Sequence, residues 1–90
     1  MKDRLYVRVC ARADEHGVIT PEAFTLNGHT LPITRVVERR ETRQTKYGGQ
    51  GTRYLVRVGQ NQACLYRDDD RRWYVEDNED VRQVSHFNGG

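Results

Sequence analysis

The fold is decided by residues 52–76, TRYLVRVGQNQACLYRDDDRRWYVE, in which apolar and polar side chains alternate with a period of two. Such alternation is typical of strands with one buried face, because successive side chains of a strand point to opposite faces of the sheet. A two-residue turn at Gln60-Asn61 pairs Val56 with Leu65. The segment therefore predicts a β-hairpin with apolar residues on one face.

The loop of residues 68–72, DDDRR, predicts a second hairpin in the same segment. Pairing across this loop brings Leu65 opposite Val75 and Arg67 opposite Trp73. Both hairpins send their apolar residues to the same side, as a half-buried sheet requires. The predicted inward face consists of Tyr54, Val56, Val58, Ala63, Leu65, Trp73 and Val75.

The first third of the chain continues the same pattern. Residues 5–11 alternate apolar with polar side chains, which predicts a half-buried strand. Asn27-Gly28 is a strong hairpin signal, because a type I′ turn needs positive φ at both central residues. This turn pairs Phe24 with Leu31, so the apolar residues again share one face.

The strand predicted from Ile33 to about Thr45 breaks strict alternation. A β-bulge near Arg35 or Val36 would restore the pattern and bend the strand, as small barrels require. The sequence thus predicts an all-β fold, a small antiparallel meander or SH3-like barrel of about five to six strands.

We expect this barrel to span residues 1–77 and to be followed by a short tail, residues 78–90. In the tail, Asn78 could cap a short helix with Val81 and Val84 on one side, or the segment could fray. The length of 90 residues fits one domain with a thin core, since apolar residues make up 36% and charged residues 31% of the chain.

Composition also predicts a cytoplasmic location. No apolar run approaches the roughly 18 residues that a membrane-spanning helix needs, and the first 14 residues, MKDRLYVRVCARAD, lack the apolar stretch of a signal peptide. We therefore expect no membrane partner. In a reducing compartment, Cys10 and Cys64 are expected to be free thiols.

The net charge of +2 hides an uneven distribution along the chain. Residues 35–57 contain seven basic and two acidic residues, a net charge of +5, whereas residues 68–80 contain two basic and seven acidic residues, a net charge of −5. This division suits an anionic partner or head-to-tail self-association. Alternatively, both regions are solvated loops and strand edges.

No motif in the sequence predicts an enzyme, a cofactor or a metal site. The glycine-rich stretch of residues 48–51 is followed by a strand and lacks Gly-Lys-Ser/Thr and a helix, so we interpret it as a hairpin connection rather than a phosphate loop. The three histidines at 16, 29 and 86 have no ligand residues at metal-binding spacing. The acidic residues 68–70 lack the spacing of a calcium loop and are interpreted as a solvated turn. Cys64, predicted opposite Arg57, has no accompanying base.

Four segments carry a resemblance to a family of short, uncharacterised bacterial proteins. These are TP at 20–21, ITRVVERR at 33–40, GGQGTRYLVRV at 48–58 and LYRDDDRRWYVE at 65–76. The resemblance covers about residues 5–76, and the chain departs from it at Leu31, where an aromatic residue is common, and after Glu76. The Tyr-x-Val-Arg and Trp strands are also loosely similar to a small domain found beside bacterial DNA-repair polymerases. The resemblance supports the predicted strands and implies no activity.

The outward face of the meander is the predicted partner-binding site. In the predicted register, Leu55 pairs with Tyr66 and Tyr66 with Tyr74, with Arg53 and Arg57 on the same face. Aromatic residues flanked by arginines on an antiparallel sheet favour nucleic-acid binding, because they stack bases and hold phosphates. The alternative is a protein-interaction or homo-oligomerisation module that uses this face. The face could also be covered by the N-terminal strand or by the tail.

Overall fold

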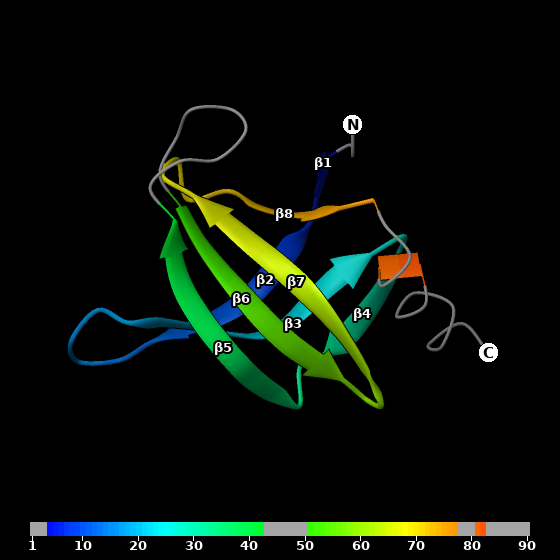
Figure 1. Ribbon diagram of the computed structural model, residues 1–90, viewed down its shortest axis with the longest axis horizontal. Helices are drawn as coiled ribbons and strands as arrows, with labels where there is room; N and C mark the ends of the chain where they lie inside the picture. The colour runs from blue at the N-terminus through cyan, green and yellow to red at the C-terminus, as the bar shows by residue number, and fades with distance from the viewer. Residues whose placement is uncertain (1–3, 43–50, 78–80, 83–90) are drawn as a thin grey trace.

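The computed structural model describes residues 4–42, 51–77 and 81–82, and antiparallel strands account for most of them. The strands are β1 (Arg4–Tyr6), β2 (Arg8–Ala13), β3 (Ile19–Leu26), β4 (His29–Pro32), β5 (Arg35–Thr42), β6 (Gly51–Val58), β7 (Asn61–Asp68) and β8 (Trp73–Glu76) (Figure 1). The prediction of a small all-β, antiparallel fold is confirmed.

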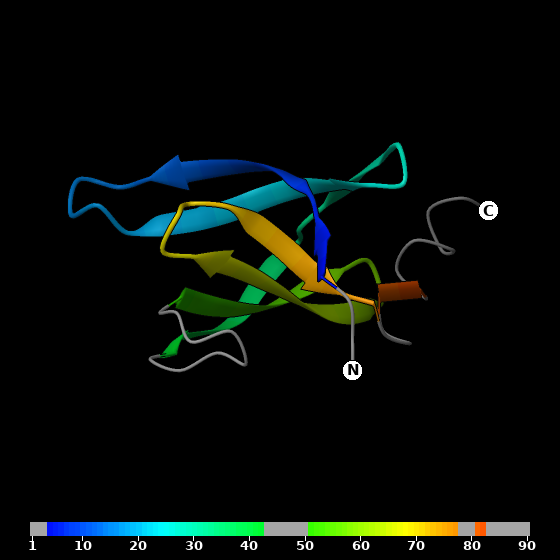
Figure 2. The same cartoon turned by 90° about the horizontal axis from the view of Figure 1, so that it is seen from above.

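The strands form two sheets that pack against each other (Figure 2), one in the order β1-β8-β7-β6-β5 and one in the order β2-β3-β4. The chain passes directly from β1 to β2 through Val7, whose N–H donates a hydrogen bond to the carbonyl oxygen of Trp73 at 3.0 Å. It passes from β4 to β5 through Thr34, whose N–H donates to the carbonyl oxygen of Arg57 at 2.9 Å. The eight segments therefore form six continuous stretches of strand, two of which, β1–β2 and β4–β5, pass from one sheet into the other.

The hairpin between β3 and β4 has the predicted turn and register. Asn27 and Gly28 have φ angles of 52° and 81°, as a type I′ turn requires. Phe24 pairs with Leu31, and both side chains are buried. Local turn chemistry and hydrophobic pattern agree here, which explains why the sequence predicted this hairpin correctly.

The turn between β6 and β7 is Gly59-Gln60, so the turn predicted at Gln60-Asn61 is wrong. Gly59 has a φ of 62°, which suits the first central position of a type II′ turn, where glycine is favoured. Val56 consequently pairs with Ala63 and not with Leu65. The register of β7 against β6 is therefore shifted by two residues from the prediction. Each side chain stays on its predicted face, because side chains alternate with a period of two.

A β-bulge in β5 confirms the expected irregularity in this strand. The register against β6 shifts between Val36 and Glu38, so Val37 has no partner residue and is 40% exposed. Thr42 then pairs with Gly51, which makes the connection of β5 to β6 a hairpin. Residues 48–50 of the predicted glycine loop lie outside the described residues.

Gly51 is required by a close backbone approach. A Cβ atom at this position would lie 2.8 Å from the carbonyl oxygen of Arg67 on the neighbouring strand β7. Any larger residue would therefore force β6 and β7 apart at the end of the sheet.

The core lies between the two sheets and contains the predicted inward residues, with one difference. Val56, Leu65 and Val75 are completely buried, but Trp73 is only partly buried because β8 begins at this residue, at the end of the sheet. The ring of Trp73 packs 5.4 Å from that of Tyr54.

Two further contacts complete this core. The hydroxyl of Tyr54 donates a hydrogen bond to the carbonyl oxygen of Ile19 at 2.9 Å and so links the sheets. Val81, which is helical and 4% exposed, packs into the same core. The predicted cap Asn78 and the second apolar position Val84 lie outside the described residues.

Within the described part of the chain, no helix has the length and apolar character needed to cross a lipid bilayer.

Candidate functional site

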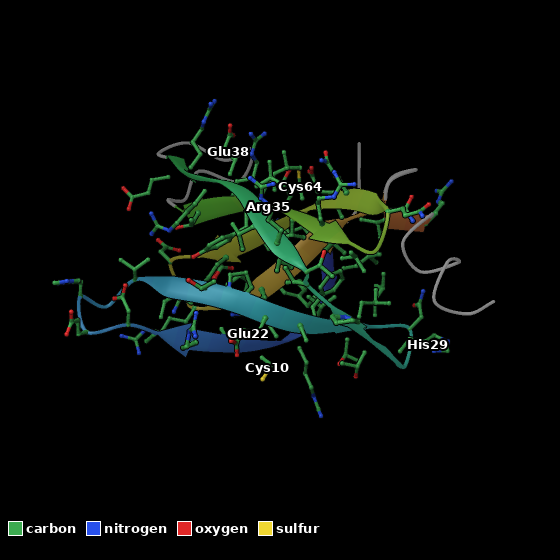
Figure 3. All side chains as sticks on the ribbon, turned by 90° about the horizontal axis from the view of Figure 1, so that it is seen from below. Cys10, Glu22, His29, Arg35, Glu38 and Cys64 are labelled. Atoms are coloured by element: carbon green, nitrogen blue, oxygen red, sulfur yellow. The ribbon has the colours of Figure 1, made fainter. Side chains whose placement is uncertain are left out.

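The outer face of the five-stranded sheet carries the residues predicted for partner binding. Burial of every second residue of β6 from Tyr54 to Val58 leaves the intervening side chains pointing away from the core. Figure 3 shows Glu38 and Cys64 on this outer face, whereas Cys10 lies on the opposite surface of the molecule. The predicted residues on the face are Arg53, Leu55, Arg57, Tyr66 and Tyr74.

The neighbours of these residues differ from the prediction. Leu55 lies opposite Cys64 rather than Tyr66, and Tyr66 lies opposite Arg53. Arg57 is not the cross-strand neighbour of Cys64, as the sequence had indicated. All these differences follow from a one-residue displacement of the β6–β7 turn, which shifts the register by two residues. Only the pair of Tyr66 with Tyr74 is confirmed.

Three tyrosines from β7, β8 and β1 form a row that we call the aromatic ladder: Tyr66, Tyr74 and Tyr6. The rings of Tyr66 and Tyr74 are stacked, with centroids 5.1 Å apart and an interplanar angle of 10°. Tyr6 contacts Tyr74 edge to face at 5.8 Å and 60°. The N-terminal strand β1 therefore extends the aromatic row and covers Tyr74, one of the two possibilities that the sequence left open.

Two arginines pack against the rings of the aromatic ladder. The Cζ atom of Arg4 lies 4.3 Å from the centre of the Tyr74 ring, and that of Arg72 lies 4.0 Å from the centre of the Tyr6 ring. Both distances are within the range of cation–π attraction. Tyr74 is only 5% exposed as a result, so the expectation that its ring stands in solvent is wrong.

Two of these tyrosine hydroxyls, those of Tyr66 and Tyr74, have a raised pKa. Burial raises the pKa of Tyr66, and the charges of Cys64 and Glu76 raise it further. The Tyr66 hydroxyl donates a hydrogen bond to Glu76 Oε1 at 3.1 Å. Burial also raises the pKa of Tyr74. The aromatic ladder is thus a packed and hydrogen-bonded unit within the sheet.

Four outward arginines on β5 and β6, which we call the arginine half, lie beside the aromatic ladder. They form two direct cross-strand pairs, Arg35 with Arg57 and Arg40 with Arg53. Like charges directly opposite one another destabilise an antiparallel sheet. This arrangement therefore opposes the stability of the fold at two places.

A single carboxylate compensates one of the two pairs. Glu38 Oε1 lies 3.0 Å from Nη2 of Arg53 and 3.6 Å from Nη2 of Arg40. Within the described residues, no carboxylate lies within ion-pairing distance of Arg35 or Arg57. The arginine half therefore carries an excess of positive charge, greatest at the Arg35–Arg57 pair.

The acidic loop between β7 and β8 has a clear structural role. Asp68 Oδ1 accepts hydrogen bonds from the backbone N–H groups of Asp70 at 3.0 Å and Arg72 at 2.9 Å. The loop also contains Arg71 at a φ of 65°. The carboxylates of residues 68–70 lie within 4.8 Å of one another, and the Asp68 side chain stabilises the turn through these two hydrogen bonds.

The two cysteines lie on opposite outer surfaces of the molecule (Figure 3) and are both free thiols, as predicted. Cys10 lines a shallow, mostly apolar depression of about 350 Å³ on the outer face of the three-stranded sheet. Its other lining residues are Arg8, Val9, Ala23, Thr25 and Thr30. Of the residues that line this depression, Arg8 alone is charged.

Sequence reasoning missed several members of the site. Tyr6 and Arg4 were not assigned to it because the pairing of β1 with β8 joins segments far apart in the sequence, which no local pattern reveals. Arg35 and Arg40 are part of the basic run, but their faces depend on the bulge at Val37. The only signal for these two residues in the sequence was the high density of arginines in the basic run.

Comparisons of the chain with protein-family models, with curated proteins and with solved structures gave no match. The family resemblance described above therefore stays a prediction.

Proposed function

We propose that this protein is a non-catalytic domain that binds nucleic acid on the outer face of its five-stranded sheet. The observation that carries the proposal is the cross-strand pair of Arg35 and Arg57, two guanidinium groups with no carboxylate partner within the described residues. A phosphate backbone supplies the missing negative charge, and guanidinium groups bind phosphate oxygens with two parallel hydrogen bonds.

The layout of the face supports phosphate contacts at more than one point. Arg53 and Arg57 are four residues apart on β6, so their Cα atoms are separated by about 13 Å along the strand. A row of cations along a strand suits a chain of phosphates better than it suits a single small anion. Sequence-independent binding of this kind is dominated by release of counterions from the nucleic acid.

The aromatic ladder has a supporting role in this proposal. Stacking of Tyr66 on Tyr74 and the contact with Tyr6 hold β7, β8 and β1 together beside the arginine half. Tyr6 is 47% exposed and is the aromatic side chain of the row most available to a base. Binding therefore depends mainly on arginines, with stacking as an added contribution.

Self-association through the same face is the alternative, and the charges oppose it. A two-fold contact centred on the arginine half would place that half of one copy against the same half of the other, so positive charge would face positive charge. Such a contact would become weaker at low salt, whereas nucleic-acid binding becomes stronger. The response to salt separates the two functions.

The test is fluorescence anisotropy with labelled oligo-dT, an RNA of mixed sequence and a DNA duplex, across a series of salt concentrations. We expect binding at low salt, and we expect Arg35→Gln and Arg57→Gln each to lower the slope of log K against log salt by about 0.7 for single strands or 0.9 for duplex. Arg8→Gln is the matched control, because it removes one positive charge from the outer face of the other sheet.

The proposal is wrong if no oligonucleotide binds at low salt, or if Arg8→Gln weakens binding as much as Arg57→Gln. Light scattering on the same samples tests the alternative. A dimer that forms in wild type and becomes tighter at high salt and in the Arg57→Gln variant, without any nucleic-acid binding, would establish self-association instead.

A further inference from the structure

Glu38 lies in the centre of the arginine half, where a phosphate of the ligand would be expected. One oxygen atom, Oε1, contacts the guanidinium groups of both Arg53, at 3.0 Å, and Arg40, at 3.6 Å. These arginines come from neighbouring strands and are directly opposite each other. A bridging anionic oxygen between two guanidinium groups is the arrangement that a phosphate oxygen would adopt at the same pair.

The bulge in β5 is what places Glu38 there. Val36 points into the core, so strict alternation would direct Glu38 to the inner face as well. The extra residue Val37 reverses the alternation, and both Glu38 and Arg40 therefore point outward. The bulge therefore places Arg40 opposite Arg53 on the outer face and also places Glu38, the carboxylate that pairs with both, on that face.

Glu38 is also free to leave. Its side chain is 42% exposed, and those of its partners Arg40 and Arg53 are 65% and 34% exposed, so all three are in contact with solvent. Exposed ion pairs of this kind are weak and are screened by salt. An incoming phosphate can therefore displace the carboxylate without disrupting the core.

We propose that Glu38 is an internal competitor for phosphate at the Arg40–Arg53 pair and so regulates the affinity of the nucleic-acid site. This inference rests on the proposed function. In the free protein the carboxylate occupies the Arg40–Arg53 pair, and the Arg35–Arg57 pair is the first contact of the phosphate backbone. The second pair binds a phosphate only after Glu38 has turned into solvent, which lowers affinity and the number of phosphates neutralised.

The test compares Glu38→Gln with Glu41→Gln in anisotropy titrations with labelled oligo-dT. Glu41 is on the same strand and pairs with an arginine, Arg39, at 3.6 Å, so its substitution changes the net charge of the protein by the same amount. We expect Glu38→Gln to bind about two- to five-fold more tightly at low salt, the range expected for removal of an exposed ion pair. Its salt slope should steepen by about 0.7, for one additional phosphate contact.

A third arm locates the effect. In an Arg40→Gln/Arg53→Gln background, the Glu38→Gln change should give no gain in affinity, because the pair for which Glu38 competes is absent. A thermal unfolding curve for each variant establishes that the fold is intact.

Three results would overturn the inference. Equal gains from Glu38→Gln and Glu41→Gln would show a general charge effect, and weaker binding by Glu38→Gln would show that this carboxylate assists the ligand; in both cases the proposed function stands. Absence of binding by both wild type and Glu38→Gln would instead remove the proposed function together with the inference.

Discussion

The aromatic ladder and the arginine half occupy the same face of the same sheet, but they are built in opposite ways. In the aromatic ladder each group has favourable neighbours: stacked rings, a hydroxyl bonded to Glu76 and arginines over ring faces. In the arginine half, like charges stand opposite one another and one carboxylate serves two cations. The first arrangement stabilises the protein, and the second costs stability.

This difference changes which residues point to function. Aromatic residues on an outward face suggest a binding platform when only the sequence is known, but here they pack against one another and against arginines. Satisfied contacts explain the tyrosines without a ligand, whereas the Arg35–Arg57 pair has no such explanation within the described residues. Local arrangements that oppose stability are more informative about binding than exposed apolar area.

The largest expected effect on stability comes from a substitution that disrupts the aromatic ladder. Tyr74→Ala removes a ring that is 5% exposed and contacts Tyr66 and Tyr6, and we expect a loss of about 3 to 5 kcal/mol in the free energy of unfolding. In a domain of this size, such a loss is comparable to the total stability. Urea denaturation followed by tryptophan fluorescence measures it.

Tyr74→Phe is the control for that substitution, because it keeps the ring and its stacking. It should stay within about 1.5 kcal/mol of wild type, the usual limit for volume-conserving changes. If Tyr74→Ala is as stable as Tyr74→Phe, the ladder is not structural, and the two halves of the face do not differ as described.

The sequence predicted the face on which each side chain lies better than it predicted the cross-strand neighbour of that side chain. Alternation with a period of two placed Val56, Leu65 and Val75 in the core whatever the register, because a slip of two residues leaves every side chain on its face. The exact turn depended on the positive φ of Gly59, which competes with an equally plausible turn one residue later. A one-residue change in the turn moved Leu55 from Tyr66 to Cys64.

The candidate site was less predictable because it depends on contacts between distant segments. The pairing of β1 with β8 brings Tyr6 to Tyr74, and the bulge at Val37 decides which residues of β5 face outward. The sequence indicated that a bulge was needed but not its exact position. Long-range strand pairing and bulge position are both set by tertiary packing, which local patterns do not encode.

A smaller effect separates the halves by their response to alkaline pH. Burial and the charges of Cys64 and Glu76 raise the pKa of Tyr66 above its ordinary value of 10.0, so the folded protein keeps this hydroxyl protonated when the unfolded chain ionises it. Its contribution to stability is therefore complete below pH 10 and is lost as the pH rises above that value. The Tyr74 shift has the same direction.

Urea denaturation between pH 8 and pH 11 measures this dependence. Tyr66→Phe should show a shallower decline in the free energy of unfolding above pH 10 than wild type, whereas Arg57→Gln should show the wild-type decline, because arginine does not titrate in this range. Identical declines for Tyr66→Phe and wild type would contradict the assignment of Tyr66 to a buried, hydrogen-bonded unit.

The smallest effect is a gain in stability from the arginine half. Arg57→Gln removes the positive charge opposite Arg35, and we expect the free energy of unfolding to rise by about 0.2 to 1 kcal/mol at low salt. The gain should shrink at 1 M salt, where charges are screened within about 3 Å. Arg8→Gln, which removes a charge opposite Thr25, should give no comparable gain.

A loss of stability at low salt would mean that Arg57 is held by favourable contacts, and the contrast with the aromatic ladder would disappear. A gain in stability together with weaker oligonucleotide binding would show that the same two guanidinium groups lower the stability of the free protein and provide its affinity for phosphate.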